Sequence, residues 1–332
     1  MKRPWLAPFV PLYAAGVALR DASIAHGLRP VRRLRWPVIS IGNLSTGGAG
    51  KTPLTITLAS LLNGAGFEVD VLSRGYGREG HTPARVRPDG TAAEFGDEPL
   101  LIAREADVPV YVAGQRYEAG LLAESERSGS LSVGVHLLDD GFQHRQLHRD
   151  VDILLMNRSD WQDNLLPAGN LRQAVHAARR ANILAIPTDD PGLEAELSAW
   201  GWRGPLWRLK RRMEVPKVGG PVIAFCGIAR PEQFFAGLES AGFRVAGRIV
   251  FSDHHKYSAR DVVHLLVAAR SAGAVALITT EKDQVRLGSL CENFAVEVPL
   301  LTARLRVEIE EEDVAVAYLA GRLRDANLHP SL

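Results

Sequence analysis

The chain of 332 residues is long enough for roughly two domains, and its 46% hydrophobic content is that of a globular protein with sizeable cores. Its formal net charge of +1 predicts neither a nucleic-acid partner nor an acidic partner from bulk charge. Neither Cys226 nor Cys291 belongs to a Cys-x-x-Cys pair, so we expect no zinc or redox motif, and a reducing compartment fits.

The first 35 residues combine an apolar stretch with a basic one. Residues 4–19 carry no charge and are rich in aromatic and aliphatic side chains, and five arginines follow between positions 20 and 35. The apolar stretch is short and interrupted by prolines, which argues against a membrane span. Apolar residues beside arginines are typical of a segment that lies in a membrane interface. A helix packed on the protein's own core explains the pattern equally well, and both interpretations stay open.

Residues 37–53 predict a phosphate-binding loop. An apolar run at 38–41 predicts a buried strand, a glycine-rich loop follows, and an apolar helical pattern begins at Leu54. Glycines let backbone N–H groups turn toward phosphate oxygens, and the helix N-terminus adds partial positive charge. Lys51 would reach the β- and γ-phosphates, and the Thr52 hydroxyl would ligate Mg²⁺. The expected nucleotide-binding residues are Ser45, Thr46, Gly47, Gly48, Ala49, Gly50, Lys51 and Thr52.

This loop departs from the strict P-loop pattern, because Ser45 stands where the first glycine is usual. The alternative is a glycine-rich turn before a helix. The flanking strand and helix favour the phosphate-binding interpretation, which predicts a nucleoside triphosphate as ligand.

Polar residues follow two later predicted strands. The strand at 69–72 leads to Arg74 and Arg78, which could hold a phosphate or another anion, although a solvated turn is the alternative. The strand at 133–138 ends in Asp139 and Asp140. An apolar strand that ends in carboxylates is the Walker B arrangement for Mg²⁺. Asp-Asp-Gly alone is more often a turn, but the glycine-rich loop in the same chain favours the metal-binding interpretation.

The acidic pair Asp97 and Glu98 precedes Pro99. Proline is tolerated in a first helical turn, so Asp97 could act merely as a helix N-cap. Strands and helices alternate along the chain, which predicts an α/β protein with largely parallel sheets. The stretch 205–220 is rich in Lys, Arg, Gly and Pro and is predicted to be a linker. We therefore divide the chain into segments 1–35, 36–212 and 213–332.

The ordered set of motifs resembles one known family. These motifs are Gly-Asn-Leu-Ser-Thr-Gly-Gly-Ala-Gly-Lys-Thr-Pro, Ser-Arg-Gly-Tyr-Gly-Arg, Gly-Asp-Glu-Pro, Leu-Asp-Asp-Gly-Phe-Gln-His, Leu-Leu-Pro-Ala-Gly, Asp-His-His-x-Tyr and Thr-Glu-Lys-Asp. Together they are similar to the tetraacyldisaccharide 4′-kinase family. The set departs from the family pattern at Asn170, where proline is usual, and at Gln173, where glutamate is usual, which leaves the role of that loop open.

The resemblance implies a fold and a function. The fold would be a P-loop NTPase-type α/β/α core with a second, smaller α/β domain and an N-terminal membrane-associating helix. The function would be transfer of the γ-phosphate of ATP, with Mg²⁺, to the 4′-hydroxyl of tetraacyldisaccharide 1-phosphate. The implied partners are the glycolipid and an anionic membrane surface, with no nucleic acid and no obligate protein partner. The implied location is the cytoplasmic face of the inner membrane, as a peripheral or monotopic protein.

The same resemblance implies residue roles. Asp97 would be the base that accepts the hydroxyl proton, and either His254 or its neighbour would assist it, with His254 preferred. Transfer itself would use Lys51 and Asp140, while Mg²⁺ would be held by Thr52, Glu98 and Asp139. The expected substrate-binding residues are Arg74, Arg78, His144 and Arg172.

Two alternatives accompany this interpretation. A P-loop GTPase-type switch or metallochaperone is one, because Thr280-Glu-Lys-Asp283 is faintly similar to the guanine-reading Lys-x-Asp motif. It predicts nucleotide turnover without lipid and dependence on a protein partner. The other is a kinase or ligase for a small soluble substrate, whose activity would be indifferent to lipid presentation.

Overall fold

The computed structural model describes residues 3–48, 50–127, 134–294 and 298–328. Ala49, an expected nucleotide contact, therefore lies outside the described residues. The strands form one twelve-stranded sheet in the order β10-β9-β11-β12-β8-β7-β6-β1-β5-β2-β4-β3. Their bounds are β1 Val38–Asn43, β2 Glu68–Ser73, β3 Ala84–Arg85, β4 Val110–Val112, β5 Gly134–Asp139, β6 Val151–Leu155, β7 Ile183–Pro187, β8 Leu206–Glu214, β9 Pro221–Cys226, β10 Arg244–Val250, β11 Ala276–Thr280 and β12 Leu300–Ile309.

Helices separate most of these strands, so the predicted α/β alternation is confirmed. Their bounds are η1 Pro4–Phe9, α1 Val10–Ala25, α2 Lys51–Gly64, α3 Ala92–Phe95, α4 Asp97–Glu105, α5 Arg116–Glu126, α6 Arg158–Trp161, η2 Val175–Arg180, α7 Pro191–Ala199, α8 Pro231–Ser240, α9 Ala259–Ser271, α10 Glu281–Leu287, η3 Gly288–Asn293 and α11 Glu312–Leu328.

Strands β1 to β7 and the helices packed on them form what we call the first lobe. Strand β1 pairs in parallel with both β5 and β6 at the centre of this lobe. Because side chains alternate across a strand, Ile39 and Ile41 face a core shared with α2, α4 and α11, whereas Val38 faces a core shared with α5. Both faces of the sheet are therefore covered, as the predicted α/β/α core requires.

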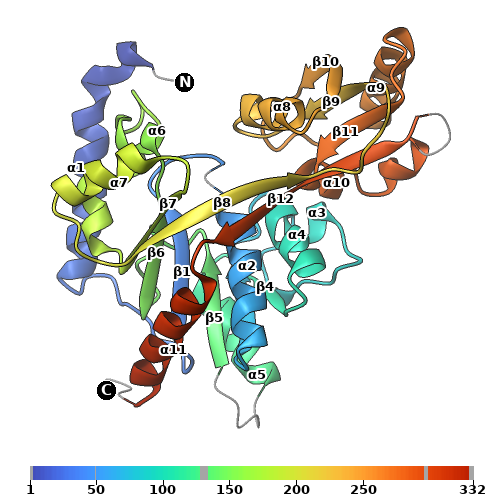
Figure 1. The fold of residues 1–332 in the computed structure, drawn as a ribbon. Coiled ribbons are helices and arrows are strands. Elements are labelled where there is room, and N and C mark those ends of the chain that lie inside the picture. The colour runs from blue at the N-terminus through green and yellow to red at the C-terminus, as the bar shows by residue number, and fades with distance from the viewer. Residues whose placement is uncertain (1–2, 49, 128–133, 295–297, 329–332) are drawn as a thin grey trace.

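The second lobe comprises β9, β10 and β11 with helices α8, α9 and α10 (Figure 1). Strand β9 pairs in parallel with both β10 and β11. Alternation along β9 again supplies two cores, since Ala224 packs with Phe235 of α8 and Phe225 packs with Leu265 of α9. The lobe is thus a small three-layer unit with its own apolar interior.

The linker predicted at 205–220 is wrong for most of its length. Residues 206–214 form β8, which pairs in parallel with β7 and antiparallel with β12. Trp207 and Leu209 are buried, while the basic side chains that suggested a linker occupy the more exposed positions of the strand. Strand β12 also pairs with β11, so the β8–β12 ribbon joins the two lobes (Figure 1). The predicted boundary at 212/213 falls inside this ribbon.

Helix α1 has two different faces. On one side, the Tyr13 hydroxyl donates to the Arg172 carbonyl and Asp21 lies 3.6 Å from Arg145. On the other side, Leu12 and Leu19 are 75% and 72% exposed. No helix in the described part of the chain combines the length and apolar character needed to cross a bilayer. The helix thus packs on the protein and still presents an apolar stripe.

A histidine on the central strand β5 is buried in the first lobe together with two carboxylates. His136 on β5 is fully buried, with Nδ1 2.7 Å from Asp70 Oδ1 and Nε2 3.4 Å from Glu124 Oε1. Burial alone would lower the pKa of His136, but the two carboxylates outweigh it and raise the pKa to about 9. The ordinary value for the unfolded chain is about 6.5.

This difference predicts a pH-dependent stability. Protonated His136 stabilises the fold fully below about pH 6.5, and the contribution is lost as pH rises through about 9. We expect the free energy of unfolding to fall over this window, by on the order of 3 kcal/mol or less. Urea unfolding at several pH values measures the fall, and His136→Asn should remove it. An unchanged slope in that variant would assign the pH dependence to other groups.

Candidate active site

The glycine-rich loop joins β1 to α2 as predicted. Gly50 has φ +90° and Gly47 has φ +93°, so both occupy the left-handed region that favours glycine. A Cβ on Gly47 would lie 2.8 Å from the Ala229 Cβ, and one on Gly50 would lie 3.1 Å from an Arg211 nitrogen. The loop thus packs closely against residues of the second lobe and of the β8–β12 ribbon, which leaves no room for side chains there.

Lys51 is the first residue of α2 and points back toward the end of β1. Its Nζ lies 3.0 Å from Asn43 Oδ1 and 3.4 Å from Asp140 Oδ1. Arg172 donates to both oxygens of Asp140, at 2.9 Å each, and to Asn43 Oδ1 at 2.7 Å. Burial favours the neutral acid, but Lys51 and Arg172 outweigh it and hold the pKa of Asp140 well below its ordinary range. Asp140 is therefore a carboxylate.

Asp139 lies at the end of β5, beside α2. Its side chain is buried and accepts a hydrogen bond from the Thr55 hydroxyl at 3.3 Å, and Thr52 is buried one turn earlier. Burial and the negative charges of Glu98 and Asp140 raise the pKa of Asp139 to about 7. This carboxylate therefore needs a nearby positive charge to stay ionised, and the carboxylate and hydroxyl oxygens suit Mg²⁺.

Among the described residues, no group of three or more His, Cys, Asp or Glu side chains could hold a metal ion. Magnesium in phosphoryl-transfer sites usually takes one or two carboxylates and completes its shell with water and phosphate oxygens. Asp139 and Glu98 with a threonine hydroxyl therefore fit an ion that arrives with its nucleotide.

Asp97 is the first residue of α4, and Gly96 with φ +91° is the N-cap, so the N-cap alternative for Asp97 is wrong. The side chain of Asp97 is buried and faces the second lobe. Its Oδ2 lies 3.1 Å from His254 Nδ1 and accepts a hydrogen bond from Arg286 Nε at 2.7 Å. Burial favours the neutral acid, but His254 and Arg286 outweigh it and lower the pKa of Asp97. The hydrogen bond between His254 and Asp97 in turn raises the pKa of His254.

His254 is held in an unusual backbone conformation. Its φ is +57°, and its N–H lies 3.2 Å from the Gly227 carbonyl and 3.1 Å from Asp253 Oδ1. Its neighbour His255 instead turns toward Asp261, at 3.3 Å. Of the two histidines, His254 contacts Asp97, and the contact crosses between the lobes.

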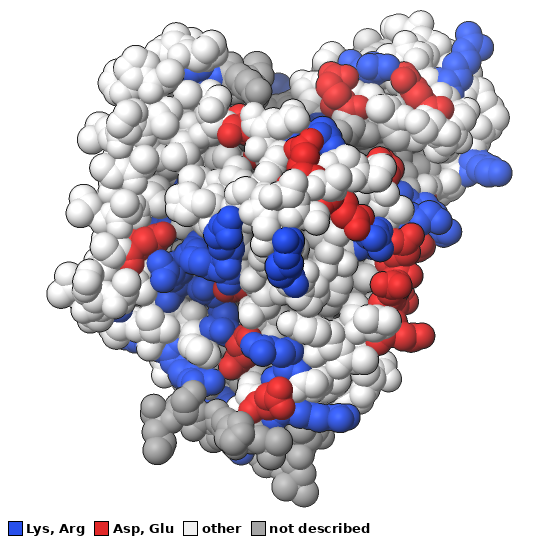
Figure 2. Space-filling model, turned by 60° about the vertical axis from the view of Figure 1, so that its left-hand side comes forward, with Lys and Arg blue, Asp and Glu red and all other residues white. Residues whose placement is uncertain are grey.

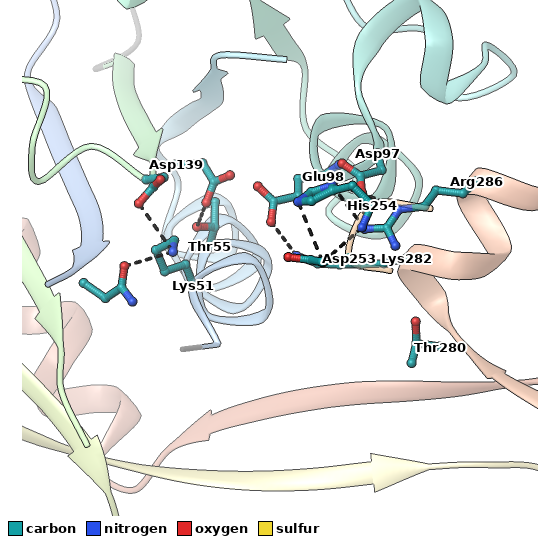
Figure 3. A network of polar contacts seen from close by, with 12 residues as sticks. Lys51, Thr55, Asp97, Glu98, Asp139, Asp253, His254, Thr280, Lys282 and Arg286 are labelled. Carbon is teal, nitrogen blue, oxygen red and sulfur yellow. Dashed lines mark hydrogen bonds and ion pairs between the residues drawn. The ribbon is translucent and has the colours of Figure 1, made fainter. Parts of the chain in front are cut away.

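Glu98 lies between the two groups of residues just described. It forms an ion pair with Lys282 of α10, and Figure 3 shows this pair between Thr55 and Asp139 on one side and Asp97 and His254 on the other. The end of the glycine-rich loop and the carboxylate–histidine pair therefore lie on either side of the Glu98–Lys282 pair at the lobe boundary.

A basic group, which we define as Arg74, Arg116, His144 and Arg149, lies within electrostatic range of Asp139 and Asp140. Burial and the three arginines lower the pKa of His144 to about 4, so its imidazole is neutral at neutral pH. Arg116 is 8% exposed, and its Nε has no hydrogen-bond partner. The face in Figure 2, which turns the α1 side forward, carries lysine and arginine side chains beside a large uncharged area. The group could hold an anion.

The structure treats the four predicted substrate residues differently. Arg74 and His144 join the basic group through Arg116, and Arg172 lies on Asp140. Arg78 donates instead to the Thr82 carbonyl at 2.9 Å, within its own loop.

Several site residues escaped the sequence reasoning. Arg116 follows β4 at the carboxyl edge of the parallel sheet, where ligands bind in such folds, so its position after a predicted strand could have identified it. Asn43 ends the strand before the glycine-rich loop and could have been found similarly. Lys282 comes two residues after β11, in the Thr280-Glu-Lys-Asp283 motif, so its position was also visible. Arg286 carries no such signal, since it reaches the site only when the lobes meet.

The motif Thr280-Glu-Lys-Asp283, which suggested a GTPase, forms structural contacts in this protein. Asp283 is fully buried and accepts hydrogen bonds from the Gly227 N–H and the Tyr257 hydroxyl, at 3.1 and 3.0 Å. Lys282 pairs with Glu98. Lys282 therefore joins the two lobes, whereas Asp283 holds together the interior of the second lobe.

Comparison with known proteins places this site in a family. The family model described as Tetraacyldisaccharide-1-P 4′-kinase matches residues 2–324. The tetraacyldisaccharide 4′-kinase of Koribacter versatilis is 41% identical over 320 residues, covering 93% of this chain and 96% of that protein. The one from Geobacter metallireducens is 40% identical over 310 residues, covering 86% and 88%.

A solved structure agrees with these relatives. LpxK from Aquifex aeolicus, determined in complex with ATP, is similar to this chain with a TM-score of 0.73 at 31% identity, covering 96% of this chain and 98% of that one. These matches lend no support to the switch or metallochaperone alternative. The chain belongs to the tetraacyldisaccharide 4′-kinase family and is an ATP-dependent kinase of lipid A biosynthesis.

Proposed function

We propose that this chain transfers the γ-phosphate of ATP to the 4′-hydroxyl of tetraacyldisaccharide 1-phosphate, with Asp97 accepting the hydroxyl proton. The observation that carries the proposal is the 3.1 Å contact between Asp97 and His254, made across the lobes, with the Glu98–Lys282 pair between it and Thr55 of the helix that follows the glycine-rich loop (Figure 3). A carboxylate that meets a histidine opposite a phosphate-binding loop suits removal of a proton from an attacking hydroxyl.

His254 assists in this proposal by orienting Asp97 and by stabilising its charge. Its raised pKa favours a protonated imidazole beside an ionised Asp97. Lys51 neutralises charge on the transferring phosphoryl group, and Arg172 keeps Asp140 in place behind Lys51. The two lobes thus contribute different parts of the site.

The nucleotide would lie on residues 45–52, with Mg²⁺ held by Thr52, Glu98 and Asp139. Mg²⁺ supplies neutralisation of the phosphate charge when it is bound with ATP. Because Glu98 is paired with Lys282, ion binding there requires that this pair loosen or reorganise.

The glycolipid would approach from the membrane along the α1 side. The exposed apolar stripe of α1 suits contact with a bilayer, and the exposed arginines at 29, 32, 33 and 35 suit an anionic surface. The basic group with Arg172 supplies charge for the sugar phosphate. We infer a peripheral protein on the cytoplasmic face of the inner membrane, where ATP is present.

The direct test is an assay of labelled-phosphate transfer from ATP to purified tetraacyldisaccharide 1-phosphate in mixed micelles. The expected product carries the label at the 4′ position and forms only with lipid present. ATP hydrolysis that is equally fast without lipid, with no labelled lipid, would contradict the proposed substrate.

Membrane contact through α1 has its own test. Leu12→Ser combined with Leu19→Ser should lower flotation with anionic liposomes by roughly tenfold or more, because each buried leucine contributes about 1.5–3 kcal/mol. The matched control is Val263→Ser with Val267→Ser, which changes two exposed apolar residues on one face of another helix, α9. Equal flotation of both double variants would show that another surface holds the membrane.

A further inference from the structure

Arg286 has a position that none of the roles above uses. It lies on α10 of the second lobe, and its side chain is 6% exposed. Its Nε donates to Asp97 Oδ2 at 2.7 Å, and its Nη2 also contacts that oxygen and lies 3.3 Å from His254 Nδ1. One guanidinium therefore contacts both Asp97, the proposed general base, and His254, which assists it.

The other edge of the same guanidinium is anchored inside the second lobe. Nη1 donates to the Gly227 carbonyl at 2.6 Å and to Asp283 Oδ1 at 3.0 Å. Asp283 is itself fully buried, where it accepts from the Gly227 N–H and the Tyr257 hydroxyl. Arg286 is thus held from behind by a buried carboxylate and a backbone carbonyl.

These contacts leave Asp97 little freedom. Its Oδ1 accepts a hydrogen bond from the Glu98 N–H at 2.9 Å, and its Oδ2 faces Arg286 and His254. Two nitrogens of one planar guanidinium converge on Oδ2, which fixes the direction of approach more closely than a point charge would, while the Glu98 N–H holds the other oxygen. The geometry of Asp97 is therefore set by the second lobe as much as by α4.

We propose that Arg286 is a positioning residue that fixes the base carboxylate of Asp97 against His254 when the two lobes meet. This inference rests on the proposed function, since it requires Asp97 to be the base. Arg286 does not bind substrate in this scheme, because each of its nitrogens already has a partner and its side chain is buried.

A simple lobe-to-lobe ion pair is the alternative explanation, and the chain offers a matched control for it. Arg306 of β12 pairs with Glu105 of α4 at 2.7 Å and with Glu281 of α10 at 3.2 Å. It thus bridges the same two helices through Glu105 and Glu281, and not through Asp97. Arg306→Ala removes a bridge of the same kind from the same boundary.

The experiment measures single-turnover phosphoryl transfer to the lipid, the ATP dissociation constant and the melting temperature. Arg286→Ala should slow transfer by roughly 10- to 100-fold, as misplacement of a reacting group by about 1 Å does. The ATP dissociation constant should stay within about twofold, since Arg286 does not touch the glycine-rich loop. Guanidinium chloride added at millimolar concentration should restore part of the transfer rate of the Arg286→Ala protein. The Arg286→Lys protein should keep less than half of the wild-type rate, because lysine lacks the planar guanidinium.

A double-mutant cycle separates this role from a structural one. Because Arg286 acts through Asp97, Arg286→Ala should slow the Asp97→Asn protein little further. A wild-type rate for Arg286→Ala would overturn the inference. The inference would also be overturned if the rate losses of Arg286→Ala and Asp97→Asn added fully in the double variant. An equal rate loss in Arg306→Ala, with no rescue of Arg286→Ala by guanidinium, would overturn it too. Failure of the proposed function is distinguishable, since it would appear as an undiminished rate for Asp97→Asn alone.

Discussion

Asp97→Asn is expected to lower the single-turnover rate of phosphoryl transfer by roughly 10²- to 10⁴-fold, because the amide cannot accept the hydroxyl proton. The substitution keeps the shape of the side chain, so the fold and the loop at 45–52 should be preserved. ATP affinity should therefore stay close to that of the wild type. Rapid-quench measurement with labelled ATP and equilibrium binding of ATP separate the two effects.

The control for this variant lies on the same helix. Glu105→Gln removes a carboxylate of α4 that also forms an ion pair across the lobes, with Arg306, but that lies away from the proposed base. It should leave the transfer rate within a few-fold of the wild type. If Asp97→Asn behaves like Glu105→Gln, Asp97 is not the base and its contacts with His254 and Arg286 are structural.

Lys51→Ala is expected to lower turnover by on the order of 10³-fold, because it removes a positive charge aimed at the transferring phosphoryl group. Folding should survive, since the Arg172–Asp140 pair, 2.9 Å apart in the unaltered protein, does not depend on the lysine. Steady-state turnover, ATP binding and the melting temperature of the same preparation test this expectation.

The matched change is Lys210→Ala, which removes an exposed lysine from β8 outside the loop. Turnover of that control should equal that of the wild type. Near-normal turnover of a folded Lys51→Ala protein would contradict the assignment of residues 45–52 as the phosphate-binding loop.

Local pattern was enough for much of the fold and of the nucleotide site. The strand, glycine-rich loop and helix around Lys51 follow from residue types over about twenty positions, because backbone freedom and apolar periodicity are local properties. Asp139 was found for a similar reason, since it directly follows an apolar strand. The ordered motifs also identified the family before any tertiary contact was known.

Local pattern failed where one segment has two environments. The basic residues of β8 suggested a linker, because their count outweighed the buried alternation of Trp207 and Leu209. Helix α1 likewise matched both a core helix and a membrane-facing one, since an uncharged stretch does not show which side meets the protein. The neighbouring strands decided the first case, since β8 pairs with β7 and β12.

By itself, the sequence determined the α/β class, the glycine-rich loop between a strand and a helix, the strand-end carboxylates and the family, because each depends on residues close together in the chain. The family resemblance paired Asp97 with His254, but only the tertiary structure decided that the two side chains touch, and that Arg286 joins them, from positions 157 and 189 residues further along. Those contacts depend on how the β8–β12 ribbon sets one lobe against the other. No periodicity or spacing in the sequence encodes the orientation of the two lobes, because that orientation arises from packing between residues that are remote in the chain.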